Sequence, residues 1–370
     1  MVKRAIAAFV ILCAVFLAVL GLGDYAMSRF APVSQDLGPA GETESEEPEE
    51  NSLLPPENPT ILIGVVGDVM MHEGQIWAGY DEVTGEFDYS EFFEEVKDDI
   101  SSCDIAIANL ETTLAGKERK FTGYPRFNSP DEIADALKEA GFDIIITSNN
   151  HCLDRGEEGL LRTLMMLEER DLIAVGTNAS EEAKERISCI ESNGIKTAIL
   201  AYTYGTNGIP IPRAKPYLVN MIEEDRILKD LSSAKELCDI VLVYLHFGQE
   251  YKREPSAEQK SLALLLLENG ADVVLGSHPH VIQPGEWVDV LDEYGRTVKK
   301  YVAYSLGNFI SAQRFPYTEE GIILQILFEK DLSSDRIIIK DIVEIDTWVE
   351  KFKSDGKMRY YVRKGRKPSS

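Results

Sequence analysis

From Thr60 onward, short runs of apolar residues alternate with longer stretches in which apolar positions recur every three or four residues. The short runs favour buried strands, and the periodic stretches favour amphipathic helices. The pattern therefore predicts strands at 61–66, 104–108, 142–146, 172–175, 196–202, 240–245, 273–275, 300–304, 322–328 and 337–344. The predicted helices are 89–100, 130–140, 159–170, 222–237 and 257–269.

Strands that alternate with helices indicate stacked α/β layers with largely parallel pairing. The closely spaced strands at the end of the chain add a mixed second sheet. Ser129 is a suitable N-cap for the helix that starts at Pro130, and Gly141 is suited to end it. We therefore predict one α/β domain over residues 60–350.

The chain starts with an apolar segment. Residues 5–23 carry no charge, Lys3 and Arg4 precede them and Asp24 follows. A run of this length can span a hydrocarbon core, and the flanking bases place the N-terminus in the cytoplasm. We predict that 1–23 is a cytoplasmic tip with a single transmembrane anchor at the cell membrane. A cleaved signal peptide, with small residues at 26 and 28, is the alternative, and a buried soluble helix is disfavoured.

Two further segments differ from the domain in composition. Residues 24–59 are rich in glutamate and proline, which favours an extended, acidic extracytoplasmic linker. Residues 351–370 hold eight bases and one acid, which predicts a basic C-terminal tail. We expect this tail to be solvated; the alternative is that it contacts polymer, cell wall or anionic lipid.

The whole chain has 63 acidic and 38 basic residues, a net charge of −25. Because the linker and the two ends do not account for this charge, the domain itself is acidic. Nucleic-acid binding needs clustered lysine and arginine side chains to contact the phosphates, so we expect no nucleic-acid partner. The five cysteines are scattered without a C-x-x-C pair, and we expect buried free thiols and no specific disulfide.

All five histidines lie at or just after the end of a predicted strand: His72, His151, His246, His278 and His280. Because ligands bind outside the carboxyl ends of strands in α/β sheets, these side chains should meet at one edge. Oxygen-bearing side chains follow strands too: Asp68, Asn109, Glu111 and Asn150. This mixture of nitrogen and oxygen donors suits one or two divalent ions, namely Mn, Fe or Zn.

Six stretches in a fixed order resemble a known family. They are Gly67-Asp68-Val69-Met70, Ala108-Asn109-Leu110-Glu111, Asn149-Asn150-His151-Cys152-Leu153-Asp154, His246-Phe247-Gly248-Gln249-Glu250-Tyr251, Gly276-Ser277-His278-Pro279-His280-Val281 and Tyr304-Ser305-Leu306-Gly307-Asn308-Phe309. In this order they resemble the calcineurin-like metallophosphoesterase superfamily and, more closely, the CapA (PgsA) family of capsule and poly-γ-glutamate synthesis. The resemblance implies an α/β/β/α sandwich.

The phosphoesterase resemblance also implies roles for individual residues. His151 would be catalytic, as a general acid or a group that stabilises charge. The metal ligands would be Asp68, Asn150, His246, His278 and His280. This chain departs from the phosphoesterase pattern in two places. Met70 stands where a histidine is expected, and after the second strand the chain has Asn109 and Glu111 where a bridging aspartate is expected.

We therefore predict that Glu111 is the bridging ligand and that His72 could replace the missing histidine. Asn109, Asp154, Glu250 and Asn308 are candidates to line the site. Glu250 lies four residues after His246 and could bind metal or orient that histidine.

Two functions follow from this resemblance. The first is a metal-dependent hydrolase, phosphoesterase-like or amide-cleaving, that acts on an anionic surface polymer such as poly-γ-glutamate. The alternative is a non-catalytic subunit that binds or exports the polymer beside membrane synthetase subunits. Both place the domain outside the cytoplasmic membrane.

Overall fold

The computed structural model describes residues 57–368 except 293 and 355. Two predicted segments, the anchor at 1–23 and nearly all of the linker at 24–59, lie outside the described residues, and the anchor stays a prediction. In the part of the chain that is described, no helix combines the length and the apolar character needed to cross a membrane.

The first sheet has eight strands in the order β14-β13-β12-β1-β2-β3-β4, and β11 pairs with β1 beside this path. Its strands are β1 (Thr60–Val69), β2 (Ile105–Leu110), β3 (Ile144–Ile146), β4 (Ile173–Val175), β11 (Asn308–Ile310), β12 (Glu320–Asp331), β13 (Arg336–Ser354) and β14 (Lys357–Lys364). Strands β1 to β4 are parallel, whereas β12, β13 and β14 are antiparallel to their neighbours.

The second sheet has six strands in the order β5-β6-β7-β8-β10-β9. They are β5 (Ser188–Ser192), β6 (Ile195–Thr203), β7 (Ile240–His246), β8 (Val273–Ser277), β9 (Ile282–Leu291) and β10 (Thr297–Leu306). The four central strands are parallel, and the edge strands β5 and β9 are antiparallel. Both sheets are therefore mixed, not only the second.

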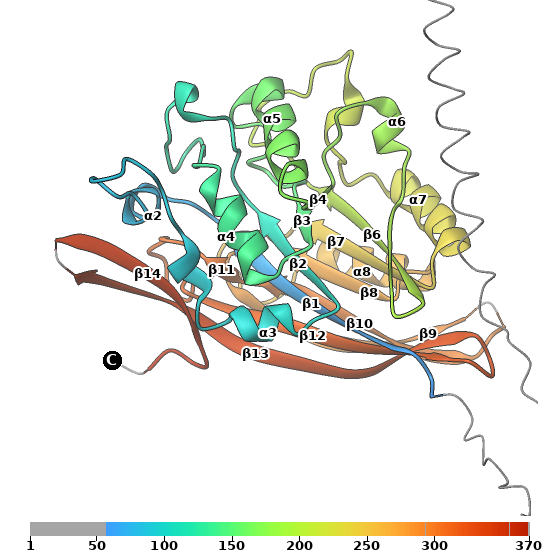
Figure 1. Ribbon diagram of the computed structural model, residues 1–370. Helices are drawn as coiled ribbons and strands as arrows, with labels where there is room; N and C mark the ends of the chain where they lie inside the picture. Colours follow the sequence, from blue (N-terminus) through green and yellow to red (C-terminus); the bar gives the residue numbers. More distant parts are fainter. Residues whose placement is uncertain (1–56, 293, 355, 369–370) are drawn as a thin grey trace, which may run out of the picture. The chain divides into compact units, whose positions relative to one another are not determined.

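Three apolar cores separate four layers. One core lies between the two sheets, and the other two lie between a sheet and its helices. The first sheet is covered by α2 (Glu73–Ala78), η1 (Ser90–Phe93), α3 (Lys97–Ser101), α4 (Glu132–Ala140) and α5 (Gly156–Glu168). The second is covered by α7 (Glu224–Leu237) and α8 (Ala257–Glu268). Three short elements, η2 (Lys117–Arg119), α6 (Glu181–Lys184) and η3 (Pro216–Leu218), lie in connections. The predicted α/β/β/α order is thus present (Figure 1).

Two local predictions about helices were wrong. The predicted helix 89–100 is divided into η1 and α3, which lets Phe92, Phe93 and Val96 all bury in one core. The predicted N-cap Ser129 does not cap α4, where Asp131 takes that position. The Ser129 hydroxyl instead lies 2.7 Å from the Thr112 hydroxyl, because both are buried beside the sheet edge.

The predicted basic tail was also wrong in extent. β13 runs through residue 350 to Ser354, and β14 returns along it. Most of the bases of this hairpin and of the segment after it pair with acids, including Arg359 with Glu91, Arg363 with Glu95 and Glu350, Lys364 with Asp99, Arg366 with Asp346, and Lys367 with Glu319. The charge excess seen in the sequence is therefore largely neutralised in the fold.

The prediction of no specific disulfide was wrong as well. Cys189 in β5 and Cys238 at the end of α7 form a disulfide, with Cα atoms 6.7 Å apart. Their separation of 49 residues hides this proximity in the sequence, and only the packing of α7 on the second sheet creates it. Cys103 and Cys152 are free, as predicted, and Cys152 is buried.

Candidate metal centre

The predicted site residues meet at the carboxyl ends of the parallel strands of both sheets. Asp68 is the penultimate residue of β1, Glu111 directly follows β2, and His246 is the last residue of β7. His278 and His280 follow β8 at once. Each is at most 4% exposed, so the cluster lies inside the molecule where the two sheets converge.

A glycine contact shapes the backbone next to Asp68. A Cβ atom at Gly67 would lie 1.9 Å from the carbonyl oxygen of Gly307, so only glycine permits this approach of the β10–β11 turn. The Asp68 amide donates to that same oxygen over 3.1 Å, and the pairing of β1 with β2 shifts register between Val65 and Asp68. The resulting bulge directs Asp68 toward the histidines.

Two of the histidines have an unusual backbone conformation. His278 has a φ of 97° and His280 a φ of 58°, in the left-handed region that non-glycine residues rarely adopt. Such conformations persist where surrounding structure imposes them, and they gather at functional sites. Here they bring both imidazoles into the same cluster.

Two groups of side chains offer atoms at distances that suit a metal ion. One contains Glu111, His278 and His280, and the other contains Asp68, Glu111 and His246; within each group the atoms lie within 4.8 Å of one another. Glu111 belongs to both groups. Its Oε1 lies 3.7 Å from His246 Nε2 and 3.8 Å from His280 Nε2. This shared position is the one expected of a bridging ligand.

The Glu111 carboxylate is the strongest indication of a cation. It is fully buried, and neither oxygen has a hydrogen-bond partner in the described part of the chain. Burial, and then the neighbouring Asp68 charge, raise the pKa of Glu111 well above its ordinary value. A buried carboxylate without donors is costly unless a cation compensates it. The donor set therefore fits a divalent ion.

The surrounding groups set the orientation and the protonation of the other proposed ligands. Asp68 lies 3.0 Å from His280 Nδ1 and accepts a 2.7 Å bond from the Asn109 amide. Although burial alone would raise it, the hydrogen bond and charge of His280 hold the pKa of Asp68 below its ordinary value. Burial, and then the charge of His278, lower the pKa of His246, while burial lowers that of His278 to about 3. Neutral imidazoles are the form that binds metals.

Asn109 and Asn150 occupy different places around this cluster. Asn109 orients Asp68 through its amide nitrogen, and its oxygen accepts from the Asn149 amide over 3.1 Å. Asn150 Oδ1 lies 2.8 Å from His246 Nε2, so its oxygen faces the second ligand group. The arrangement makes Asn150 a candidate oxygen ligand and Asn109 a supporting residue.

His151 lies beside the cluster and is held by its own partners. Its Nδ1 is 2.7 Å from Asp154 Oδ2, and that oxygen also accepts from the Phe127 amide over 2.6 Å. The Phe127 ring packs edge-on against the imidazole, with centroids 4.6 Å apart. These contacts fix the ring plane of His151 and leave its Nε2 free of the carboxylate.

The structure also places the remaining candidates. His72 caps α2 and packs edge-on against Phe127, and Glu250 is exposed in the turn after β7. Within the described residues, neither joins the two ligand groups. Asn308 Oδ1 lies 3.2 Å from His280 Nδ1, so it lines the site. Met70, at the departing position, is buried, and its sulfur lies 3.9 Å from the Ser311 hydroxyl.

Sequence reasoning missed three residues here. Ser277 Oγ lies 2.8 Å from His246 Nδ1, and Tyr204 packs against His278 with ring centroids 4.5 Å apart. The Asn207 amide nitrogen lies 3.4 Å from either nitrogen of the His151 ring. Tyr204 directly follows β6, so the rule that located the histidines could have found it.

The fold and this cluster define a two-sheet α/β protein with a candidate metal centre at the edge where its parallel strands end. The bacterial capsule synthesis protein family PGA_cap matches residues 62–313. The chain belongs to this family, which confirms the resemblance drawn from the six stretches.

Named relatives agree with this assignment. The chain is 29% identical over 280 residues to the capsule biosynthesis protein CapA of Bacillus anthracis, covering 73% of this chain and 64% of that protein. It is 29% identical over 270 residues to the PGA biosynthesis protein CapA of Bacillus subtilis, covering 72% and 67%. Among solved structures, it resembles the calcineurin-like phosphoesterase YfkN from Bacillus subtilis, with 13% identity, a TM-score of 0.45, and coverage of 78% and 91%.

Proposed function

We propose that this chain is a membrane-anchored, extracytoplasmic protein of capsule or poly-γ-glutamate synthesis or export with a metal-dependent hydrolase-type site. The observation that carries the hydrolase proposal is Glu111, a fully buried carboxylate without a hydrogen-bond donor that is common to two ligand groups. Asp68, Asn150, His246, His278 and His280 complete the proposed ligand set for one or two ions of Mn, Fe or Zn.

A divalent ion bound here would supply Lewis acidity and would activate water near neutral pH. The chain's own residues provide the setting. Asp68 and Glu111 bring two carboxylates into a buried space, where they attract a cation. The bond between Asp68 and His280 Nδ1 leaves His280 Nε2 directed toward Glu111. Partners of this kind set which imidazole nitrogen is available as a ligand.

His151 has the geometry of a proton donor to a leaving group. Asp154 holds Nδ1, so a protonated imidazole would present its second proton from Nε2. Asn207 lies against the same ring and would restrain it further. The bond that breaks in this proposal is a phosphoester or an amide, and the polymer partner is anionic, in keeping with the relatives' names.

The compartment has independent support in the cysteine pair. Disulfides persist in oxidising compartments such as the cell exterior and are rare in the cytosol. The Cys189–Cys238 bond therefore supports an extracytoplasmic domain behind the apolar segment 5–23. In denaturant, the full chain should titrate two fewer thiols before reduction than after it. Equal counts would contradict this placement.

Metal analysis of the full chain, purified in mild detergent with Mn, Zn or Fe supplied, tests the hydrolase proposal. We expect one or two ions per chain, a loss of metal in His280→Ala, and retained metal with lost hydrolysis in His151→Ala. Phosphoester and γ-glutamyl substrates would be screened together. A content below about 0.2 ions per chain in the native protein would refute the proposal.

A non-catalytic polymer-binding subunit is the second candidate, working beside membrane synthetase subunits. Met70 favours it, because a buried thioether occupies the place where the phosphoesterase pattern has a metal-binding histidine. His151→Ala and His280→Ala would be expressed in cells that lack the native chain. Polymer output that stays unchanged in His280→Ala, which should lose metal, and in His151→Ala, which should lose hydrolysis, would favour this candidate over the hydrolase.

A further inference from the structure

One cavity outside the metal centre differs from that centre in charge. It has a volume of about 540 Å³ and lies between the segment 313–316 and strand β13. Arg314, Lys351 and Lys367 contribute bases to its lining, and Glu319 and Glu350 contribute acids. Both acids already pair with cations, Glu319 with Lys367 and Glu350 with Arg363.

Two cations in this cavity lack such partners. Arg314 is exposed and forms no ion pair among the described residues, and the Lys351 ammonium donates only to the backbone oxygen of Gln313, over 2.8 Å. Burial lowers the pKa of Lys351, so its charged form would be stabilised by an added anion. These cations contrast with five bases farther along the chain that pair with acids: Arg359, Arg363, Lys364, Arg366 and Lys367.

The same segment connects this cavity to the metal centre. His280 Nδ1 lies 3.2 Å from Asn308 Oδ1, and the Asn308 amide donates to the Gln313 side chain over 3.0 Å. Lys351 then donates to the Gln313 backbone oxygen. Three contacts thus join a proposed metal ligand to the unpaired ammonium group.

Aromatic rings line the path between the two sites. Phe315, half exposed in the cavity wall, packs on Tyr251 with centroids 4.3 Å apart, and Tyr251 lies 6.2 Å from His280. Beside them, the Arg253 guanidinium lies 4.2 Å over the Tyr317 ring. An anionic chain leaving the cavity would therefore pass rings and a further arginine, and also the exposed Glu250 beside Tyr251, before it reached the histidines.

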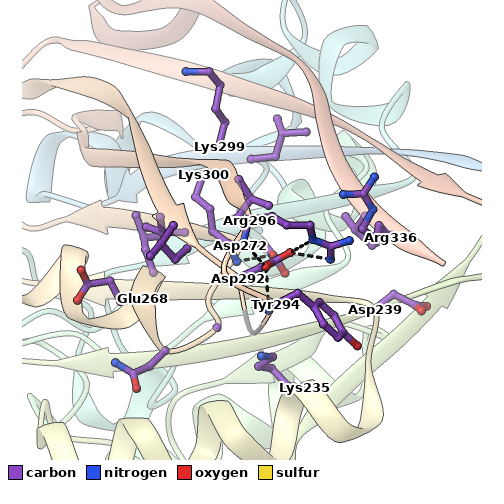
Figure 2. A pocket seen from close by; sticks show the side chains of 18 of the residues that line it. Lys235, Asp239, Glu268, Asp272, Asp292, Tyr294, Arg296, Lys299, Lys300 and Arg336 are labelled. Carbon is purple, nitrogen blue, oxygen red and sulfur yellow. Dashed lines mark hydrogen bonds and ion pairs between the residues drawn. The ribbon is translucent and has the colours of Figure 1, made fainter. Parts of the chain in front are cut away.

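A larger cavity is also lined by bases but lies elsewhere in the fold. It has a volume of about 900 Å³ and lies near Asp239 and Asp272, which precede β7 and β8, at the edge opposite the metal centre. Three of its five bases pair with the protein's own acids: Figure 2 shows Arg296 bonded to Asp292, Lys299 pairs with Asp289, and Lys300 binds Asp272 over 2.8 Å. Lys235 and Arg336 form no ion pair among the described residues, but this cavity lies away from the proposed metal ligands.

We propose that the cavity lined by Arg314 and Lys351 is a subsite for the carboxylates of an extended polyanion whose chain reaches the metal centre. This rests on the proposed function for its polymer, since a carboxylate polymer is the substrate class considered there. Arginine and lysine are the side chains that bind carboxylates, and the partly desolvated position of Lys351 makes the contact less sensitive to salt than a surface pair.

Binding of a fluorescently labelled poly-γ-glutamate oligomer to the full chain, measured by anisotropy in EDTA, tests this subsite apart from the metal. We expect the double variant Arg314→Gln/Lys351→Gln to bind the oligomer about tenfold more weakly, because it loses one exposed and one half-buried charge contact. Arg314→Gln alone, at an exposed position that folding does not need, should lose about threefold. Lys353→Gln is the matched control, an exposed lysine on the same strand that does not line the cavity.

Several results would overturn the proposal. They are unchanged binding by both Arg314→Gln and the double variant, an equal loss in the Lys353→Gln control, or binding of inorganic polyphosphate as tight as that of the oligomer. Metal content of the double variant, measured in parallel without EDTA, should equal that of the native chain. A chain that binds no metal but keeps this pattern of polymer binding would refute the hydrolase and leave the subsite standing.

Discussion

Replacing the buried carboxylate Glu111 by the isosteric amide, Glu111→Gln, should separate metal binding from folding. The substitution keeps the side-chain volume and removes a charge that has no hydrogen-bond donor in the described part of the chain. An unsatisfied buried polar group costs about 1–3 kcal/mol, and more when it is charged. In EDTA the variant should therefore be at least as stable as the native chain.

The sign of the pH dependence follows from the raised pKa of Glu111. A carboxyl group whose pKa is higher in the folded than in the unfolded state stabilises the fold when it is protonated. This stabilisation is lost as the pH rises above the pKa of the group in the unfolded chain. The native chain in EDTA should thus lose stability relative to Glu111→Gln as the pH is raised above 4.5.

Added metal should reverse the order of the two proteins. A ligand at 100 times its dissociation constant stabilises the folded state by about 2.7 kcal/mol. For a folded unit of this size, that corresponds to a rise in Tm of about 4 °C. We expect this rise in the native chain and in the control Glu268→Gln, an exposed carboxylate at the end of α8, but not in Glu111→Gln.

Thermal unfolding followed by circular dichroism, with EDTA and with each of Mn, Zn and Fe, measures the stability in EDTA, its dependence on pH and the rise in Tm with metal. An equal metal-dependent rise in Glu111→Gln would refute the shared-ligand role. A variant that is clearly less stable than the native chain in EDTA would show instead that the carboxylate serves the fold.

Three further substitutions test other parts of the structure. Asp154→Asn should lower the hydrolysis rate about 100-fold with unchanged metal content, because His151 loses the carboxylate that fixes it; loss of metal as well would argue against this role. Gly67→Ala should destabilise the fold by more than about 2 kcal/mol in urea unfolding, whereas Gly205→Ala, with open space around it, should have little effect. Asp239 has a lowered pKa because its bonds to the Lys196 amide and Lys330 outweigh burial, so Asp239→Asn should cost more stability at pH 7 than at pH 3. A cost independent of pH would contradict that assignment.

The sequence alone predicted the sheet edge at which most of the candidate side chains meet. Each histidine follows an apolar run, and in a parallel sheet the ends of such strands share an edge, so local pattern was enough to predict a cluster. The family resemblance supplied Asp68, Asn150, His246, His278 and His280, and the structure brings their side chains together. Residues 61–66 and 240–245 were found as strands because buried parallel strands are continuously apolar.

Elements whose pattern is mixed were not found. Strand β9 alternates exposed and half-buried residues and contains Pro284, and β14 is dominated by charge, so neither has the apolar run that marks a central strand. Their pairing depends on the strand beside them, which is a contact between distant residues. The first part of β13 was predicted as the strand 337–344, but the end of β13 and all of β14 appeared in the sequence only as a basic tail.

Only the tertiary structure decided which side chains lie next to each charged group and each thiol. The sequence determined the residue types, the strands and the edge at which they end. It could not show that Glu111 belongs to two ligand groups, that Cys189 meets Cys238, or that Arg314 and Lys351 form no ion pair among the described residues while Lys367 does. These facts depend on how two sheets stack and where loops from both converge, and a linear pattern of apolar and polar residues carries no information on contacts between side chains so far apart in the chain.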